Sequence, residues 1–166
     1  MADPRTLVVM RHAKSSWRTS EPDFRRPLSE RGTRDAVVAG QRFATLGLDV
    51  VICSAATRAQ QTWQCLKLGG ATCSDVRVEE RLYGAWSSEV LELLRGVPAD
   101  ARTVLVIGHE PTLSELVTSL AVSSPLADTV ADKFPTAAVA VLQHDLDWDE
   151  LDLGTARLVS LEVPRG

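Results

Sequence analysis

The chain has 166 residues and a mass of 18.0 kDa, and 45% of its residues are hydrophobic while 24% are charged. These values are typical of a globular protein, and we expect a single domain over residues 1–166. The formal net charge of -4 argues against nucleic acid as a partner. The sequence starts without the apolar segment of a signal peptide and contains no apolar run of membrane-spanning length, so we expect a cytoplasmic protein with no membrane partner.

The three cysteines, Cys53, Cys65 and Cys73, are odd in number and form no Cys-x-x-Cys pair. This pattern is untypical of a disulfide framework and of a zinc site. We interpret all three as small packing residues.

Apolar runs and helical periodicities alternate along the chain. Ser29 is a good N-cap for the first helix, which we expect to continue to about Gly47. The other predicted helices are residues 56–68, residues 89–94 and one that begins near Thr112. The predicted strands, in chain order, are residues 6–10, 50–53, 76–78, 103–107, 137–142 and 156–163.

This alternation predicts an α/β fold, a three-layer sandwich in which helices cover both faces of a mostly parallel central sheet. Residues 123–132 contain Pro125 and form the most irregular interior segment of the sequence. We interpret them as a surface loop or as a flap over a pocket, and the sequence does not distinguish the two.

Chemically capable side chains follow three of the predicted strands. The first strand ends in Arg11 and His12, the second leads into Arg58, and the strand at residues 103–107 is followed by His109. Ligands bind at the carboxyl ends of strands in an open parallel sheet, so we expect these four side chains to meet. Polar residues at the end of any one strand would be unremarkable, because strand ends often face water. The occurrence of all four side chains at the ends of predicted strands predicts a ligand-binding site.

The chemistry of this set is narrow. Guanidinium groups match the oxygens of a phosphate, and a neutral imidazole can attack phosphorus to give a covalent intermediate. A second imidazole can donate a hydrogen bond as charge moves to the phosphoryl oxygens. Neither a metal nor another cofactor is needed, and we interpret the third histidine, His144, as a surface residue rather than a metal ligand.

The basic residues are concentrated near these positions. Residues 11–34 contain seven Lys and Arg against three Asp and Glu, in a chain whose total charge is negative. Such a segment suits a small or local anion better than a long polyanion, although a merely solvated loop has the same composition.

Four sequence blocks, VVMRHAKSSW, RPLSERG, SAATRAQQT and VLVIGHEPTL, occur in this order within residues 7–120. They resemble the signature blocks of the histidine phosphatase superfamily, and the RHAKS form resembles its SixA-type phosphohistidine phosphatases. The resemblance implies one histidine phosphatase-like domain over residues 1–166. It also implies that His12 is the phosphorylated nucleophile and that Arg11, Arg58 and His109 complete the phosphate pocket. Ser15 and Arg18 fall where family members often have further phosphate contacts.

The sequence departs from the family where many members have a glutamate as general acid. Tyr83 stands at that position, and Glu80 just upstream is the candidate replacement. Expelling an alkoxide produces a base whose conjugate acid has a pKa near that of water, about 15.7, and a proton donor then matters. Imidazole, with a pKa of about 6.5, leaves with much less help. The missing acid therefore favours a phosphoramidate bond.

We accordingly expect a metal-independent phosphatase that works through a phosphohistidine intermediate and removes phosphate from a phosphohistidine of a protein. One alternative is a phosphomonoesterase for a small phosphorylated molecule, of the sugar phosphate or phosphoglycerate type. The other is a phosphate-binding module without catalysis, although such a module has no need of the nucleophile His12.

Overall fold

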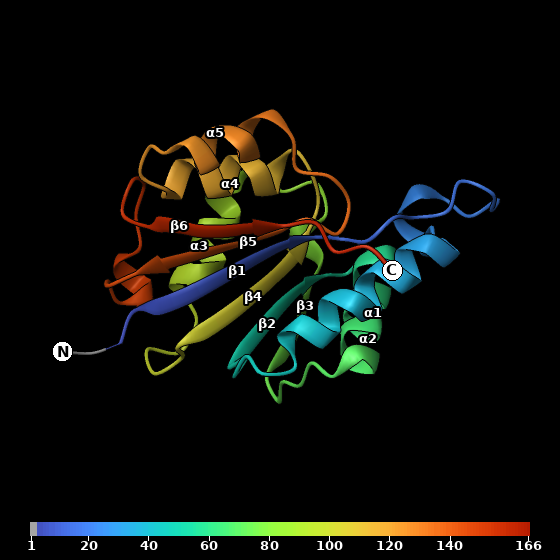
Figure 1. Ribbon diagram of the computed structural model, residues 1–166, viewed down its shortest axis with the longest axis horizontal. Helices are drawn as coiled ribbons and strands as arrows, with labels where there is room; N and C mark the ends of the chain where they lie inside the picture. The colour runs from blue at the N-terminus through green and yellow to red at the C-terminus, as the bar shows by residue number, and fades with distance from the viewer. Residues whose placement is uncertain (1–2) are drawn as a thin grey trace.

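The computed structural model describes residues 3–166, which form six strands in one sheet with the order β3-β2-β4-β1-β5-β6 (Figure 1). The first four strands in the chain run parallel, whereas β5 is antiparallel to β1 and β6 is antiparallel to β5. The strands are β1 (Arg5–Arg11), β2 (Val50–Ser54), β3 (Val76–Glu79), β4 (Thr103–Gly108), β5 (Val139–His144) and β6 (Arg157–Glu162).

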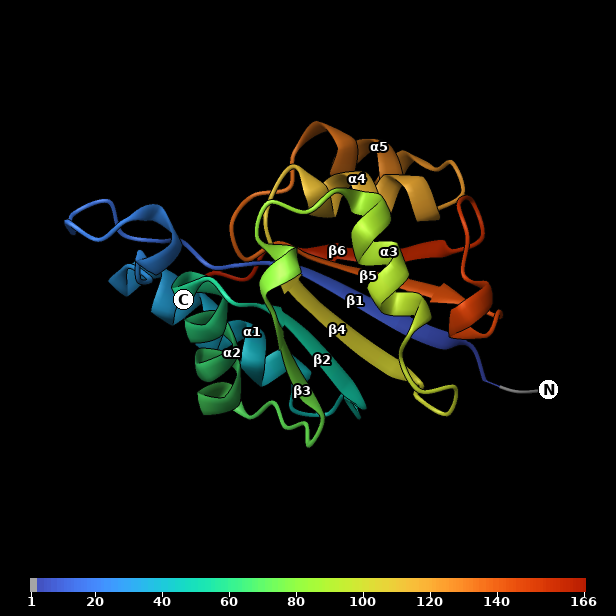
Figure 2. The ribbon, with the colours of Figure 1, turned by 180° about the vertical axis from the view of Figure 1, so that it is seen from behind.

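Five helices cover the two faces of this sheet. They are α1 (Glu30–Phe43), α2 (Thr57–Gly69), α3 (Ser87–Arg95), α4 (Thr112–Leu120) and α5 (Pro125–Asp132). Helices α1 and α2 pack on one face, and α3, α4 and α5 pack on the other, where Figure 2 shows α3 crossing in front of the sheet. The predicted three-layer α/β fold is confirmed. No helix within residues 3–166 has the length and apolar character that crossing a membrane requires.

The central strands are apolar throughout because both faces are covered. In β1, Leu7 and Val9 belong to the core shared with α3, α4 and α5, whereas Val8 and Met10 belong to the core shared with α1 and α2. All four side chains are almost completely buried. The alternation follows from the two-residue period of a strand, and it holds the end of β1 at a defined orientation.

The first turn of α1 is fastened to the loop that follows β1. Ser29 caps the helix by accepting a hydrogen bond from the backbone N–H of Gly32 at 3.0 Å, as its sequence position predicts. The backbone N–H and hydroxyl of Ser29 both donate to the carbonyl of Lys14. A Cβ on Gly32 would lie 2.1 Å from this same carbonyl, so only glycine allows the close approach.

The expectation that residues 123–132 are irregular is wrong, because Pro125–Asp132 form α5. Ser124 caps this helix by accepting a hydrogen bond from the N–H of Ala127 at 3.1 Å, and Pro125 occupies the first turn. Proline is well tolerated there because its missing N–H needs no partner inside the helix. The residue that suggested a loop in fact begins a helix.

The interpretation of His144 as a surface residue is also wrong, because its exposed fraction is 1%. A 3-10 turn, Trp148–Glu150, folds back over the end of β5. The indole of Trp148 packs edge-on against the imidazole, with ring centroids 4.7 Å apart, and donates a hydrogen bond to the carbonyl of Ala101. Acidic neighbours in the sequence suggested exposure, but the turn hides the ring from solvent.

Candidate active site

The carboxyl ends of β1 and β4 and the start of α2 meet around a cavity of about 320 Å³. The four side chains that the strand-end pattern predicts, those of Arg11, His12, Arg58 and His109, all line it. The complete lining is Arg11, His12, Lys14, Ser15, Trp17, Arg26, Arg58, His109, Glu110 and Thr136. The structure therefore brings the predicted set together at one edge of the sheet.

His12 is held in the tautomer that leaves Nε2 without a proton. Its Nδ1–H donates to the backbone carbonyl of Ala13 at 2.7 Å, so the proton of the neutral ring is on Nδ1 and the lone pair is on Nε2. The residue is 6% exposed. Burial is the main cause that lowers the pKa of His12 to about 3, with His109, Arg58 and Arg11 lowering it further. At neutral pH Nε2 is therefore an unprotonated nitrogen.

Arg58 connects this nitrogen to a carboxylate. Its Nε–H points at Nε2 of His12, with a separation of 3.4 Å. Its Nη1 donates to the backbone carbonyl of Asp23 at 2.7 Å, and its Nη2 donates to the Asp23 carboxylate at 3.2 Å. Because three of its donors are engaged, the guanidinium has one fixed orientation beside His12.

His109 lies next to His12, with ring centroids 5.2 Å apart. Its Nε2 is 2.7 Å from the hydroxyl of Ser54, and its buried Nδ1 has no partner among residues 3–166. Burial is the first cause and Arg58 the second that lower the pKa of His109 to about 4. When the Ser54 hydroxyl donates to Nε2, the proton of the neutral ring is on Nδ1 and is available to a ligand.

Arg11 provides a second unsatisfied donor. Its Nη1 donates to the carbonyl of Phe134 at 3.2 Å, while its buried Nε has no partner within the described chain. Burial lowers the pKa of Arg11, against the raising effect of Glu110, but an arginine remains charged at any physiological pH. A buried cation with a free N–H favours binding of an anion.

The weaker predicted contacts are not all at the cavity. Ser15 lines it, but its hydroxyl already accepts a hydrogen bond from Arg26 Nη1 at 2.7 Å. Arg18 is exposed and lines a neighbouring cavity instead. Glu80 is exposed at the start of the 3-10 turn Glu80–Leu82, outside the residues that line the cavity.

Sequence reasoning missed Asp23, which lies in a 3-10 turn, Asp23–Arg25, between β1 and α1. Its carboxylate accepts hydrogen bonds from Tyr83 at 2.5 Å and from Arg26 at 3.2 Å, besides that from Arg58. The hydrogen bond from Tyr83 is the largest cause that lowers the pKa of Asp23 to about 2. This carboxylate is thus ionised at neutral pH.

The donors in the cavity suit an anion rather than a cation. Two imidazoles lie among four Lys and Arg side chains, and Glu110, the single carboxylate of the lining, is engaged by the N–H and the hydroxyl of Ser114. Among the described residues, a close group of metal-ligating side chains occurs at Asp147, Asp149 and Glu150, which are exposed and do not line this cavity. The composition of the lining thus fits a bound anion.

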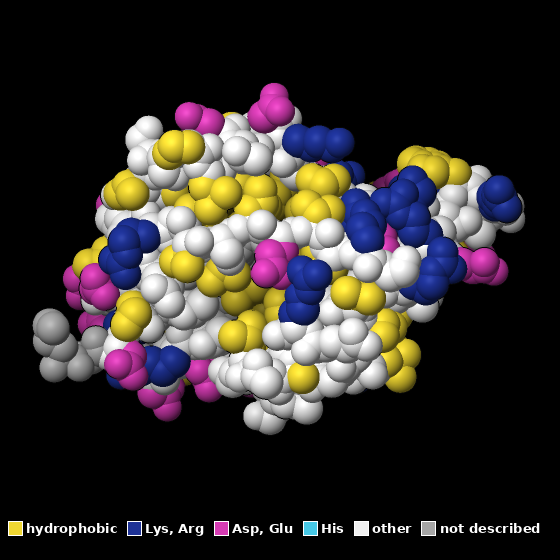
Figure 3. Space-filling model, viewed as in Figure 1, with side chains coloured by type: hydrophobic (Ala, Val, Ile, Leu, Met, Phe, Trp, Pro, Cys, Tyr) yellow, Lys and Arg dark blue, Asp and Glu magenta, His cyan; other side chains and the backbone are white. Residues whose placement is uncertain are grey.

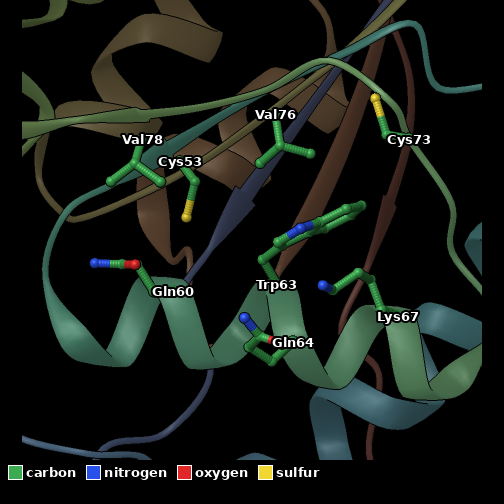
Figure 4. A pocket seen from close by; sticks show the side chains of 8 residues that line it. All are labelled: Cys53, Gln60, Trp63, Gln64, Lys67, Cys73, Val76 and Val78. Carbon is green, nitrogen blue, oxygen red and sulfur yellow. The ribbon is translucent and has the colours of Figure 1, made fainter.

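Another cavity, of about 260 Å³, lies between α2 and the strands β2 and β3 (Figure 4). Cys53 and Cys73 line it together with Trp63 and Lys67. Burial raises the pKa of the Cys53 thiol to about 12, so it is not a nucleophile at neutral pH. This agrees with a packing role for the cysteine.

The model of the histidine phosphatase superfamily (branch 1) matches residues 7–93, more than half of the chain. The chain belongs to the histidine phosphatase superfamily. An uncharacterized relative in Mycobacterium tuberculosis is 40% identical over 162 residues, which cover 94% of this chain and 100% of the relative. Membership supports a phosphatase, and the residues of the VVMRHAKS block lie within the matched region.

Solved structures from the superfamily share the whole fold. A candidate phosphohistidine phosphatase SixA from Nakamurella multipartitia has a TM-score of 0.88 and 35% identity, and the alignment covers 98% of each chain. A protein histidine phosphatase SixA complexed with tungstate has a TM-score of 0.78 and 22% identity, covering 96% of this chain and 97% of the other. At 22% identity, the similarity to the tungstate complex shows a shared fold only.

Proposed function

We propose that this chain is a metal-independent phosphatase that uses His12 as nucleophile and removes phosphate from a phosphohistidine of a protein. The observation that carries the proposal is the state of His12. Its Nδ1–H is bound to the Ala13 carbonyl, its Nε2 is unprotonated, and Nε2 faces the Nε–H of Arg58 in a cavity lined by further cations. This combination is suited to attack on a phosphoryl group.

The phosphoryl group binds with its oxygens directed to Arg11, Arg58 and His109. The two buried donors without partners, Arg11 Nε and His109 Nδ1, gain acceptors when the anion enters. The same donors meet the charge that shifts between the oxygens during transfer, and they are already oriented before the reaction begins.

In the first step, His12 Nε2 forms a bond to phosphorus and the bond from phosphorus to the substrate nitrogen breaks. A substrate imidazole that is protonated on its other nitrogen leaves as neutral imidazole. In the second step, water attacks the phosphorus, the bond to His12 breaks, and inorganic phosphate departs. Splitting the reaction into two displacements lowers the barrier of each.

The surroundings of Tyr83 support the choice of leaving group. The Tyr83 hydroxyl donates its proton in a hydrogen bond to Asp23, and that carboxylate carries no proton because its pKa is about 2. The hydrogen bond to Asp23 also raises the pKa of the tyrosine. Neither Tyr83 nor Asp23 is therefore well suited to donate a proton as general acid at neutral pH. This favours a substrate whose leaving group departs without being protonated by the enzyme.

The test is a substrate panel in the presence of a chelator, with wild type and His12→Ala. We expect hydrolysis of a phosphohistidine protein and of phosphoramidate, slow hydrolysis of alkyl phosphates, and loss of at least about 10³-fold in rate for His12→Ala. A quench in alkaline denaturant should trap phosphate on His12, to be located by mass spectrometry. Rapid turnover of a sugar phosphate but not of phosphohistidine would favour a small-molecule phosphomonoesterase. Loss of activity with chelator would contradict a metal-independent reaction.

A further inference from the structure

A larger cavity adjoins the one that contains His12. Its volume is about 680 Å³, and it lies between the loop after β1 and the first turn of α1. Lys14, Ser15 and Trp17 line both cavities, so the two lie side by side. A phosphorylated residue bound at His12 would therefore have its flanking groups beside the larger cavity.

The charge of this larger cavity is strongly positive. Its lining contains one carboxylate, that of Glu30, and four cations, Lys14, Arg18, Arg31 and Arg34, after which we name it the basic groove. Lys14, Arg18 and Arg34 are exposed and form no salt bridge with any residue of the described chain, whereas Arg31 pairs with Asp35. Figure 3 shows the Lys and Arg side chains gathered at this end of the molecule. Like charges in one groove repel, and a bound anion relieves that repulsion.

Trp17 stands at the junction of the two cavities. Its side chain is 77% exposed, which is unusual for so large an aromatic residue. The Arg26 guanidinium lies 3.5 Å from the ring centroid and is itself anchored by hydrogen bonds to Ser15 and Asp23. An exposed tryptophan on a fixed support is typical of the side chains that carry the binding energy of a protein–protein contact.

We propose that the basic groove binds an acidic polypeptide segment that flanks the phosphorylated residue of the protein substrate. The inference rests on the proposed function and adds the chemistry of the partner. Residues 11–34 carry seven Lys and Arg against three Asp and Glu, whereas the whole chain has a net charge of -4, so the remaining surface is strongly acidic. An acidic partner is attracted to this end of the molecule and repelled elsewhere, which orients it toward His12.

The experiment compares two synthetic phosphohistidine peptides, one with glutamates and one with glutamines next to the phosphorylated residue. Free phosphoramidate serves as the small substrate. The test variant is Arg34→Glu, because Arg34 lines the groove but not the cavity of His12. The matched control is Lys67→Glu, the same reversal of charge at an exposed cation that forms no ion pair within residues 3–166 and lines a different cavity (Figure 4).

For wild type at low salt, we expect kcat/KM to be about tenfold higher for the acidic peptide, and we expect this preference to vanish at about 1 M salt. Arg34→Glu should abolish the preference and leave phosphoramidate hydrolysis unchanged, while Lys67→Glu should retain both. Equal kcat/KM of the wild type for the two peptides would contradict the binding of an acidic segment in the basic groove. An equal loss of the preference in Arg34→Glu and in the control Lys67→Glu would contradict it as well. Hydrolysis of phosphoramidate with no cleavage of either peptide would instead overturn the proposed function, and this inference with it.

Discussion

The hydroxyl of Tyr83 donates a hydrogen bond to the carboxylate of Asp23, and Nη2 of Arg58 donates to the same carboxylate oxygen. The tyrosine is thus linked to His12 through two intermediate side chains, since Arg58 Nε points at His12 Nε2. Tyr83 stands where many family members have a glutamate as general acid. In this chain, its hydrogen bond to Asp23 links that position to the orientation of Arg58.

Removing the carboxylate should loosen that arginine. We expect Asp23→Ala to lower kcat/KM for phosphoramidate by about tenfold, because the orientation of Arg58 then depends on fewer contacts. Half of the Asp23 side chain is exposed, so solvent screens the ion pair and a larger effect is not expected. Tyr83→Phe, which retains the ring and loses only the hydroxyl, should have the smaller effect. The opposite order would indicate that the hydroxyl itself takes part in the chemistry.

Installing a carboxylic acid at position 83 should change the choice of leaving group. In Tyr83→Glu the new carboxyl lies beside the ionised Asp23, whose negative charge should raise the pKa of the new carboxyl. The rate for alkyl phosphates relative to phosphoramidate should then rise by about 10²-fold, at the low end of general acid catalysis. Tyr83→Gln is the control, since it offers no acidic proton. An equal rise in both variants would exclude proton donation as the cause.

The protonation of the histidines can be measured directly. Burial lowers the pKa of His12 to about 3 and that of His109 to about 4, so both rings should remain neutral when the pH falls from 7 to 5. In ¹⁵N NMR spectra of the imidazoles at pH 5, His12 should have a protonated Nδ1 and an unprotonated Nε2. The urea-unfolded chain should titrate near the ordinary value of about 6.5. A midpoint near that value for folded His12 would contradict the geometry described here.

The third histidine should affect stability rather than catalysis. Burial lowers the pKa of His144, so the unfolded chain takes up a proton there as the pH falls below about 6.5 while the folded chain resists it. The free energy of unfolding should therefore decrease with falling pH in this range. His144→Leu should make that decrease in the free energy of unfolding shallower. The substitution breaks no hydrogen bond of the ring, because both ring nitrogens lack partners among residues 3–166, and it should leave activity unchanged. Urea unfolding at pH 7 and pH 5 measures the effect, and an unaltered pH dependence would refute it.

The sequence was sufficient to predict the sheet and the meeting of Arg11, His12, Arg58 and His109. Buried parallel strands are apolar along their whole length, and the fold brings their carboxyl ends to one edge. The position of each side chain then follows from where its strand stops. The periodicity of apolar residues is a local property of the sequence. The strands and their ends can therefore be predicted without knowing which distant residues are in contact.

The missed Asp23 and the misplaced His144 have a common cause, which is contact between distant segments. Asp23 meets Arg58 across 35 positions of sequence, from a turn without periodicity. His144 is buried by a turn that closes over it, and nothing in its own neighbourhood predicts that cover. For α5 a local signal existed, because Ser124 followed by Pro125 is a good helix start, but the helix has only eight residues.

The alternation along β1 limits how such a protein can change its length during evolution. Leu7 and Val9 face one core while Val8 and Met10 face the other, and the next two residues are Arg11 and His12. Inserting or deleting one residue in this strand would exchange its two faces and turn His12 away from the cavity. Insertions are tolerable only after the strand ends, in the loop that leads to α1. That loop also lines the basic groove. The segment whose length can vary most easily is therefore the one that would determine which partner binds.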